Sequence, residues 1–162
     1  MKIIPSTLPA LQAASAVPQL ARGRVTFVAG TTGAVAQHTV FTITGMVAFG
    51  FYAQCITALD SGGAATISHG NAGAVAALGA ATTATTIDPI DGLAPGSTTW
   101  MEAATFGTLG TGGLLLHVST GTDITADILT TTITGGVLEY ILFWVPLSAG
   151  ATVALGSELV AS

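Results

Sequence analysis

The stretch Val137-Leu-Glu-Tyr-Ile-Leu-Phe-Trp-Val-Pro146 predicts a β-strand that is apolar on both of its faces. Successive side chains of a strand point to opposite sides of the sheet. The apolar residues therefore form two sets, one for each side: Val137, Ile141, Phe143 and Val145, and Leu138, Tyr140, Leu142 and Trp144. A strand of this kind is covered on both sides, whereas two stacked sheets cover only one face of each sheet.

The second covered side predicts contact with another chain. We expect a homo-oligomer, with a trimer as the first guess, although a loop or the N-terminal segment could also cover this side. The candidate interface residues are those of the second set: Leu138, Tyr140, Leu142 and Trp144. The scarcity of charge supports this expectation, because charged residues make up 7% of the chain against about 25% in an average globular protein.

Working outward from this strand, runs of β-branched and aromatic residues between glycines predict an all-β fold. Strands are expected at 25–29, 35–44, 46–59, 64–69, 98–104, 114–119, 124–133 and 137–147, with weak pairing at 82–87. The first two, joined by a turn at 30–33, predict a hairpin. Residues 72–81 predict a helical turn or a loop, and 88–96 a loop. Eight or nine antiparallel strands are typical of a β-sandwich or jelly roll.

Residues 1–24 differ from the remainder, because they hold three of the six prolines and all three Lys and Arg residues. We expect an extended N-terminal arm that lies across a neighbouring subunit. The candidate partner-binding residues of this arm are Lys2, Pro5, Pro9, Pro18, Arg22 and Arg24. Residues 25–162 then form one β-sandwich domain.

The mean hydropathy of +0.74 raises the question of a membrane protein. A spanning helix needs about 20 predominantly apolar residues, but glycines, threonines and amides interrupt the uncharged stretch 25–59. Pro5 and Pro9 also break the apolar region of any secretory signal. We therefore expect no membrane partner and synthesis in the cytoplasm. Nucleic acid is not expected as a partner either, because no Lys or Arg follows Arg24 to neutralise phosphates.

The metal-ligating residue types are scattered. His38, His69 and His117 stand alone, without the close ligand pair of a zinc site, although one histidine per subunit could still meet on an oligomer axis. Cys55, the one cysteine, predicts a buried small apolar residue. No metal site or cofactor is therefore expected within one chain.

The acidic residues offer two close pairs. Asp88 and Asp91 could ligate calcium, but they lack the oxygen-rich spacing of an EF-hand loop. Asp123 and Asp127 predict a solvated edge that discourages stray strand pairing. Nucleophile-elbow, Walker and dinucleotide-binding motifs do not occur, and no pair of carboxylates is placed for acid–base work. We therefore expect no catalytic residues and no enzymatic activity.

Three segments carry a resemblance to a known class of proteins: "GAVAQHTVFTITGMVAFGFYAQCITAL", "SGGAATISHGNAGAVAALGAATTATTID" and "TADILTTTITGGVLEYILFWVPLSAGATV". In texture and segment order, residues 25–153 resemble small proteins encoded among the structural genes of tailed bacteriophages. The resemblance implies a virion protein with a β-sandwich or jelly-roll fold. It implies no catalytic residue.

Within that class, the chain is similar to head decoration or cement proteins. This similarity implies that it binds the major capsid protein on the capsid surface and stabilises the assembled head. A tail, neck or fibre component is the alternative, although no 20 to 50 residue repeat or heptad run is present. A lectin-like ligand-binding sandwich is a more distant alternative. The candidate loops for such a site contain Ala, Gly and Thr, with Trp100 as the exception.

Overall fold

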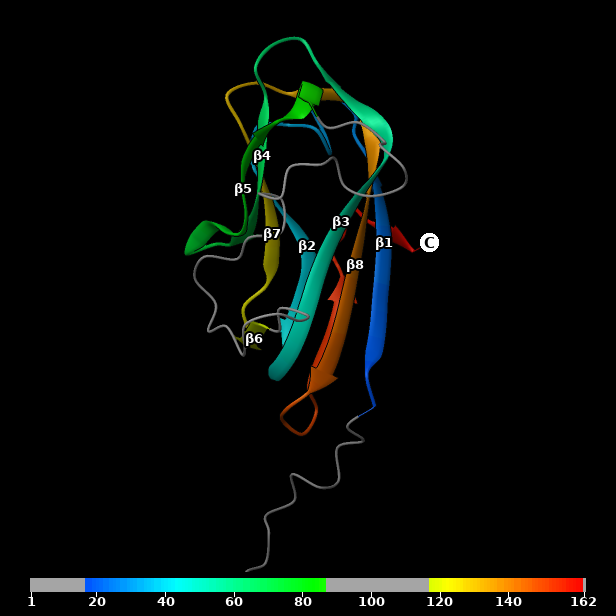
Figure 1. The fold of residues 1–162 in the computed structure, drawn as a ribbon, viewed down its shortest axis with the longest axis vertical. Helices are drawn as coiled ribbons and strands as arrows, with labels where there is room; N and C mark the ends of the chain where they lie inside the picture. The colour runs from blue at the N-terminus through cyan, green and yellow to red at the C-terminus, as the bar shows by residue number, and fades with distance from the viewer. Residues whose placement is uncertain (1–16, 87–116, 162) are drawn as a thin grey trace, which may run out of the picture.

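The computed structural model describes residues 17–86 and 117–161, which fold into two five-stranded antiparallel sheets (Figure 1). Sheet A has the strand order β10-β1-β8-β3-β6, and sheet B has the order β5-β4-β7-β2-β9. The prediction of an all-β protein is thus confirmed. Within these ranges, no helix has the length and apolarity needed to span a membrane.

The elements follow one another along the chain with connections of at most ten residues wherever the connection lies within the described ranges. In order they are β1 (Gln19–Thr26), β2 (Gln37–Thr44), β3 (Met46–Ser61), β4 (Thr66–Asn71), β5 (Ala74–Thr83), a 3-10 turn η2 (Ala84–Thr86), β6 (His117–Thr120), β7 (Ile124–Leu129), β8 (Ile133–Pro146), β9 (Thr152–Leu155) and β10 (Val160–Ala161). Of the connections that lie wholly within the described ranges, β4–β5 alone stays in one sheet, and the others cross between sheets.

This crossing makes the predicted hairpin between the first two strands wrong. β1 lies in sheet A, where it pairs along its whole length with β8, and β2 lies in sheet B between β7 and β9. The turn between them is present, because the Val28 carbonyl accepts hydrogen bonds from the amides of Thr31 and Gly33. A Cβ at Gly33 would lie 1.9 Å from the Ile133 carbonyl oxygen. Because residue 33 is a glycine, the turn can pack against the start of β8, and β2 does not fold back on β1.

The predicted boundary of the N-terminal arm is also wrong. Residues 19–24, which we expected in the arm, form most of β1, in register with β8 from Gln19↔Trp144 onward. Arg22 and Arg24 are therefore part of the sheet, and Pro18 lies exposed just before it. Lys2, Pro5 and Pro9 lie outside the described residues. The unusual composition of residues 1–24 did not show that residues 19–24 follow the alternating pattern of a β-strand.

The remaining strand predictions agree for six elements and differ for others. β2, β3, β4, β6, β7 and β8 lie where strands were expected, within a few residues at their ends. Residues 72–81 form neither a helical turn nor a loop, because most of them belong to β5. Residues 82–87 include the end of β5 and η2. β9 and β10 were not expected, and the predictions for 88–96 and 98–104 lie outside the described residues.

β3 and β8 are the longest strands, with 16 and 14 residues. They pair from Val47↔Pro146 to Ser61↔Ile133, with register shifts after Cys55. Gly136, with φ +103, allows a close approach here, because a Cβ at this position would lie 2.5 Å from the Ala58 carbonyl oxygen. This pair forms the middle of sheet A, and β1 extends the sheet on the far side of β8 (Figure 1).

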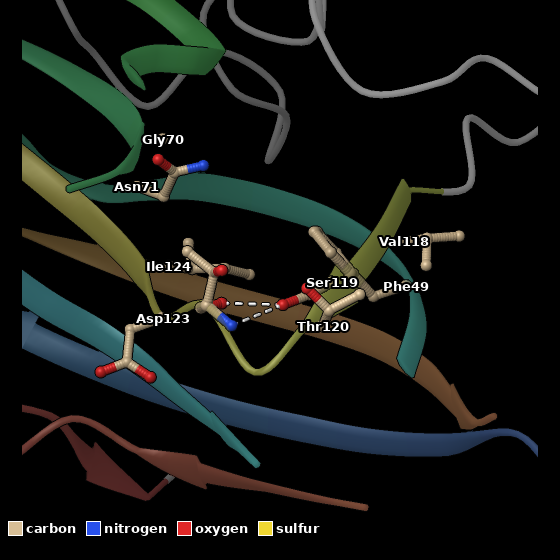
Figure 2. Close-up of a pocket in the computed structure, with 9 residues that line it drawn as sticks. Phe49, Gly70, Asn71, Val118, Ser119, Thr120, Asp123 and Ile124 are labelled. Carbon is tan, nitrogen blue, oxygen red and sulfur yellow. Dashed lines mark hydrogen bonds between the residues drawn. The ribbon is translucent and has the colours of Figure 1, made fainter. Parts of the chain in front are cut away.

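The turn between β6 and β7 carries the chain from sheet A to sheet B. Ser119 Oγ accepts a hydrogen bond from the Thr122 amide at 3.0 Å and donates one to the Thr122 carbonyl at 2.9 Å (Figure 2). Asp123 Oδ1 accepts a hydrogen bond from the Ile43 amide, which ties the turn to β2. Side chains thus provide the bonds that a sheet ladder does not provide at this crossing.

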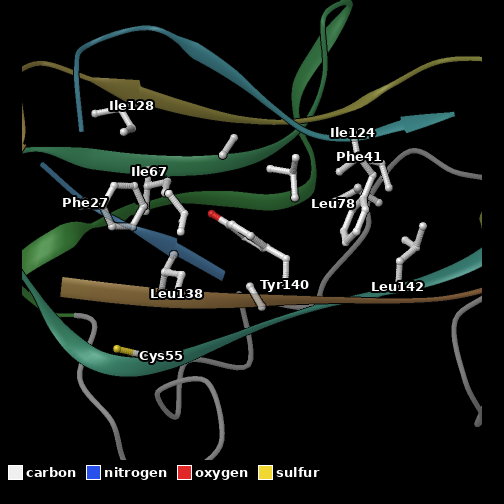
Figure 3. Close-up of a cluster of buried hydrophobic side chains, with 14 of the residues drawn as sticks. Phe27, Phe41, Cys55, Ile67, Leu78, Ile124, Ile128, Leu138, Tyr140 and Leu142 are labelled. Carbon is white, nitrogen blue, oxygen red and sulfur yellow. The ribbon is translucent and has the colours of Figure 1, made fainter. Parts of the chain in front are cut away.

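One hydrophobic core lies between the two sheets (Figure 3). Leu138, Tyr140, Leu142 and Trp144 of β8 point into it and are at most 6% exposed. These four residues were our interface candidates, so that assignment is wrong. The alternation along the strand was read correctly, but a period of two does not say which face is the inner one. The outward face of β8 is the first set, which includes Ile141, Phe143 and Val145.

The two faces of β8 predict opposite costs for truncation. Leu142→Ala removes a fully buried side chain and should lower the free energy of unfolding by about 2–5 kcal/mol. Phe143 is the next residue of β8 and is 44% exposed on the outward side. Phe143→Ala should therefore lower the free energy of unfolding by clearly less. Chemical denaturation at constant m-value measures both. Equal losses, or a larger loss at Phe143, would contradict this assignment of faces.

Candidate functional site

The outward face of sheet A carries a continuous apolar surface. The strand register places Leu20 beside Phe143, Ile141 beside Tyr52, and Val145 beside Ala48, which in turn pairs with Val118. These side chains point away from sheet B, because their neighbours along each strand form the core. We call this surface the apolar face and define it by six residues: Leu20, Met46, Val118, Ile141, Phe143 and Val145.

The apolar face is open to solvent at its largest side chains. Leu20 is 56% exposed, Phe143 is 44%, and Met46 and Val118 are each 40%. Phe143 packs edge-on against Tyr52, with ring centroids 5.9 Å apart. Single exposed apolar residues are common on proteins, but contiguous ones mark surfaces that bind other molecules. Four strands contribute to this one.

A charged row borders the apolar face. Glu139 of β8 lies between β1 and β3, and its side chain is fully buried although it belongs to the outward set. Arg22 Nη2 donates to Oε2 at 2.6 Å, and Arg24 Nε donates to Oε1 at 2.8 Å. The bond to Glu139 raises the pKa of Arg22 above its ordinary value. Both arginine side chains remain nearly half exposed.

This row carries a net charge of +1, from two guanidiniums and one carboxylate. Arg22 and Arg24 account for all the Lys and Arg of the described residues. They were predicted to bind a partner from a free arm, but they bond to a strand of their own chain. Glu139 was missed as their partner, because strand register cannot be read from composition. The signal in the sequence was an acid at an outward position of an otherwise apolar strand.

The histidines form separate polar contacts. His69 Nε2 lies 3.1 Å from Tyr140 Oη within the core, and burial lowers the pKa of His69 to about 3. Burial also raises the pKa of Tyr140. His38 Nδ1 lies 2.7 Å from Glu158 Oε2, and its Nε2 lies 2.9 Å from the Ala34 carbonyl oxygen. Although both histidines pair in register with Ala126, they bond to different partners.

The acids are placed differently from the prediction. Asp127 is 6% exposed and accepts hydrogen bonds from Gln37 Nε2 at 3.0 Å and from Thr125 Oγ1 at 3.3 Å. It lies on β7, the central strand of sheet B, so the prediction of a solvated edge is wrong for this residue. Asp88 and Asp91 lie outside the described residues. Within 17–86 and 117–161, no three His, Cys, Asp or Glu side chains gather closely enough to hold a metal ion.

A small cavity opens beside the β6–β7 turn. It has a volume of about 70 Å³ and is lined by Phe49, Asn71, Ser119 and Ile124, among others. Figure 2 shows the Asp123 carboxylate pointing away from it, toward β2. Ligand pockets usually have about 300–1,000 Å³, so this cavity has room for a few water molecules and not for a sugar. Cys55 is buried, as expected.

Comparisons with protein-family models, with curated proteins and with solved structures found no significant match to this chain. The apolar face of sheet A, bordered by Arg22 and Arg24, is thus the candidate functional site on geometry alone. It offers apolar area and hydrogen-bond donors to a macromolecular surface.

The buried His69 predicts acid sensitivity of the fold. The unfolded chain binds a proton at His69 below its ordinary pKa of about 6.5, whereas the folded protein does so near pH 3. The contribution of neutral His69 to the free energy of unfolding is therefore complete above pH 6.5 and is lost progressively toward pH 3. By pH 4.5 this loss amounts to roughly 2–3 kcal/mol.

Denaturant unfolding at pH 7 and pH 4.5 measures this loss. His69→Gln, which does not titrate, should reduce the difference between the two pH values by about that amount. His38→Gln serves as the matched control and should leave the contribution of His69 in place. An unchanged pH dependence in His69→Gln would show that acid destabilisation has another source.

Proposed function

We propose that this chain is a non-enzymatic structural protein of a tailed-phage virion, a β-sandwich or jelly-roll protein that decorates and cements the assembled head. The observation that carries the proposal is the apolar face of sheet A. A chain with this much uncharged outward surface suits an assembly in which every copy is covered by protein. The resemblance of residues 25–153 to phage structural proteins supports the same function.

The physical requirements of a cement protein agree with the described fold. Such a protein holds a shell together by burying area at several contacts at once, so it needs a rigid scaffold and surfaces that exclude water. The two sheets provide the scaffold through one shared core. The exposed threonines of the strands, such as Thr42 and Thr44 of β2, suit wet contacts, because their methyl groups pack while their hydroxyls form hydrogen bonds.

Reinforcement has an energetic signature. A protein that binds only the intact shell stabilises it by mass action, by about 2.7 kcal/mol at a free concentration one hundred times the Kd. In a phage that encodes this chain, heads made without it should assemble but rupture at lower temperature or under osmotic shock. Adding the purified protein back to expanded heads should restore their resistance.

Electron microscopy of labelled virions distinguishes the alternatives. Label on the head surface, together with the loss of durability in its absence, is the result expected of a cement protein. Label confined to tails, necks or fibres would contradict a role on the head and would support the alternative function, a tail, neck or fibre component. Heads that are equally durable without the protein would contradict reinforcement even if the label lies on the head.

A further inference from the structure

We propose that the apolar face of sheet A is a homotypic interface, where a second copy of the chain stacks face to face about a two-fold axis. The inference does not depend on the virion proposal, because it requires only copies of this chain. Sheets pack face to face about 10 Å apart when side chains of both faces interdigitate. The core side of sheet A already does so with sheet B, and the apolar face offers the same kind of surface outward.

The area agrees with a weak, concentration-dependent interface. β3 and β8 each offer about four outward positions, whereas β1 and the four-residue β6 offer about two each. At a strand spacing of about 4.8 Å and a row spacing of about 6.8 Å, these positions cover roughly 400 Å² for each copy. Two copies would bury roughly 800 Å² in total, the size of a weak interface. Arg22 pairs in register with Ile141 and therefore lies at the side of this area. The six members of the apolar face carry no charge, so they can lose their water at low cost.

The charged row selects the orientation of the two copies. A two-fold axis parallel to the strands would place the Arg22–Glu139–Arg24 groups of both copies, each with net charge +1, at the same end of the interface. A two-fold axis across the strands sets this row against the opposite end of the face, at Met46 and Thr120. Repulsion between like charges therefore favours the second arrangement.

Stacking also fixes the number of copies. A two-fold interface uses the same patch on both subunits and closes at two. The sequence led us to guess a trimer, but a trimer would need a heterologous contact between two different patches. The apolar face pairs with itself, so we infer a dimer. In this dimer Phe143 of each copy lies near the centre, opposite the row of Val145, Ala48 and Val118.

Sedimentation equilibrium of the full chain, from 1 to 100 µM, tests the proposal. The wild type should be dimeric at the upper concentrations. Phe143→Glu should weaken dimerisation by at least about thirtyfold, the effect of losing one central anchor residue. Leu129→Glu is the matched control, because Leu129 is equally exposed at 44% but belongs to sheet B. This variant should dimerise like the wild type.

A second variant guards against misfolding of Phe143→Glu. Val118→Thr combined with Val145→Thr keeps β-branched side chains on the strands while removing apolar contact area, and it should weaken dimerisation without altering circular dichroism. Dimerisation should change little between 50 and 500 mM NaCl, because no ion pair crosses the proposed contact.

Several results would overturn the proposal. A wild type that is monomeric at 100 µM would show that another segment of the chain or a different protein covers the apolar face. A trimer would contradict the two-fold arrangement. Dissociation of Leu129→Glu, full dimerisation of folded Phe143→Glu, or strong weakening of the dimer by salt would place the contact elsewhere.

Discussion

The pairing of β3 with β8 is the contact on which the rest of the structure depends. These two strands are long enough to run the length of sheet A, and β1 and β6 pair with them at the sides. Because alternate residues of β8 point in opposite directions, one strand supplies Leu138 and Leu142 to the core and Ile141 and Phe143 to the outward face. The core and the candidate site are therefore two sides of the same ladder of hydrogen bonds.

Buried polar groups are stabilised differently on the core side and on the outward side of β8. Toward the core, Tyr140 contacts His69, and burial keeps the imidazole neutral at physiological pH. On the outward side, Glu139 is equally buried, but two arginines at the surface compensate for its charge. A carboxylate removed from water needs such partners. The arginines also end the apolar face, because their charged groups remain in contact with solvent.

The sequence predicted what depends on local alternation. β3 and β8 could be placed from long runs of β-branched and aromatic residues, and the burial of Cys55 followed from its apolar neighbours. Three features depend on pairing across the chain, and local pattern does not encode it. They are the place of β1 in sheet A, the inner face of β8 and the burial of Asp127 in sheet B. β5 was missed because its five alanines and its one glycine have low strand propensity, and its pairing with β4 compensates for this.

The central claim is that β8 faces its own core on one side and a partner on the other. Hydroxyl-radical footprinting over a range of protein concentrations tests it most directly, because it reports solvent access side chain by side chain. Tyr140 and Trp144 should be protected at every concentration, whereas Phe143 and Tyr52 should react at low concentration and become protected as copies associate. Phe143 protected in the monomer, or Trp144 reactive in the folded protein, would contradict the account.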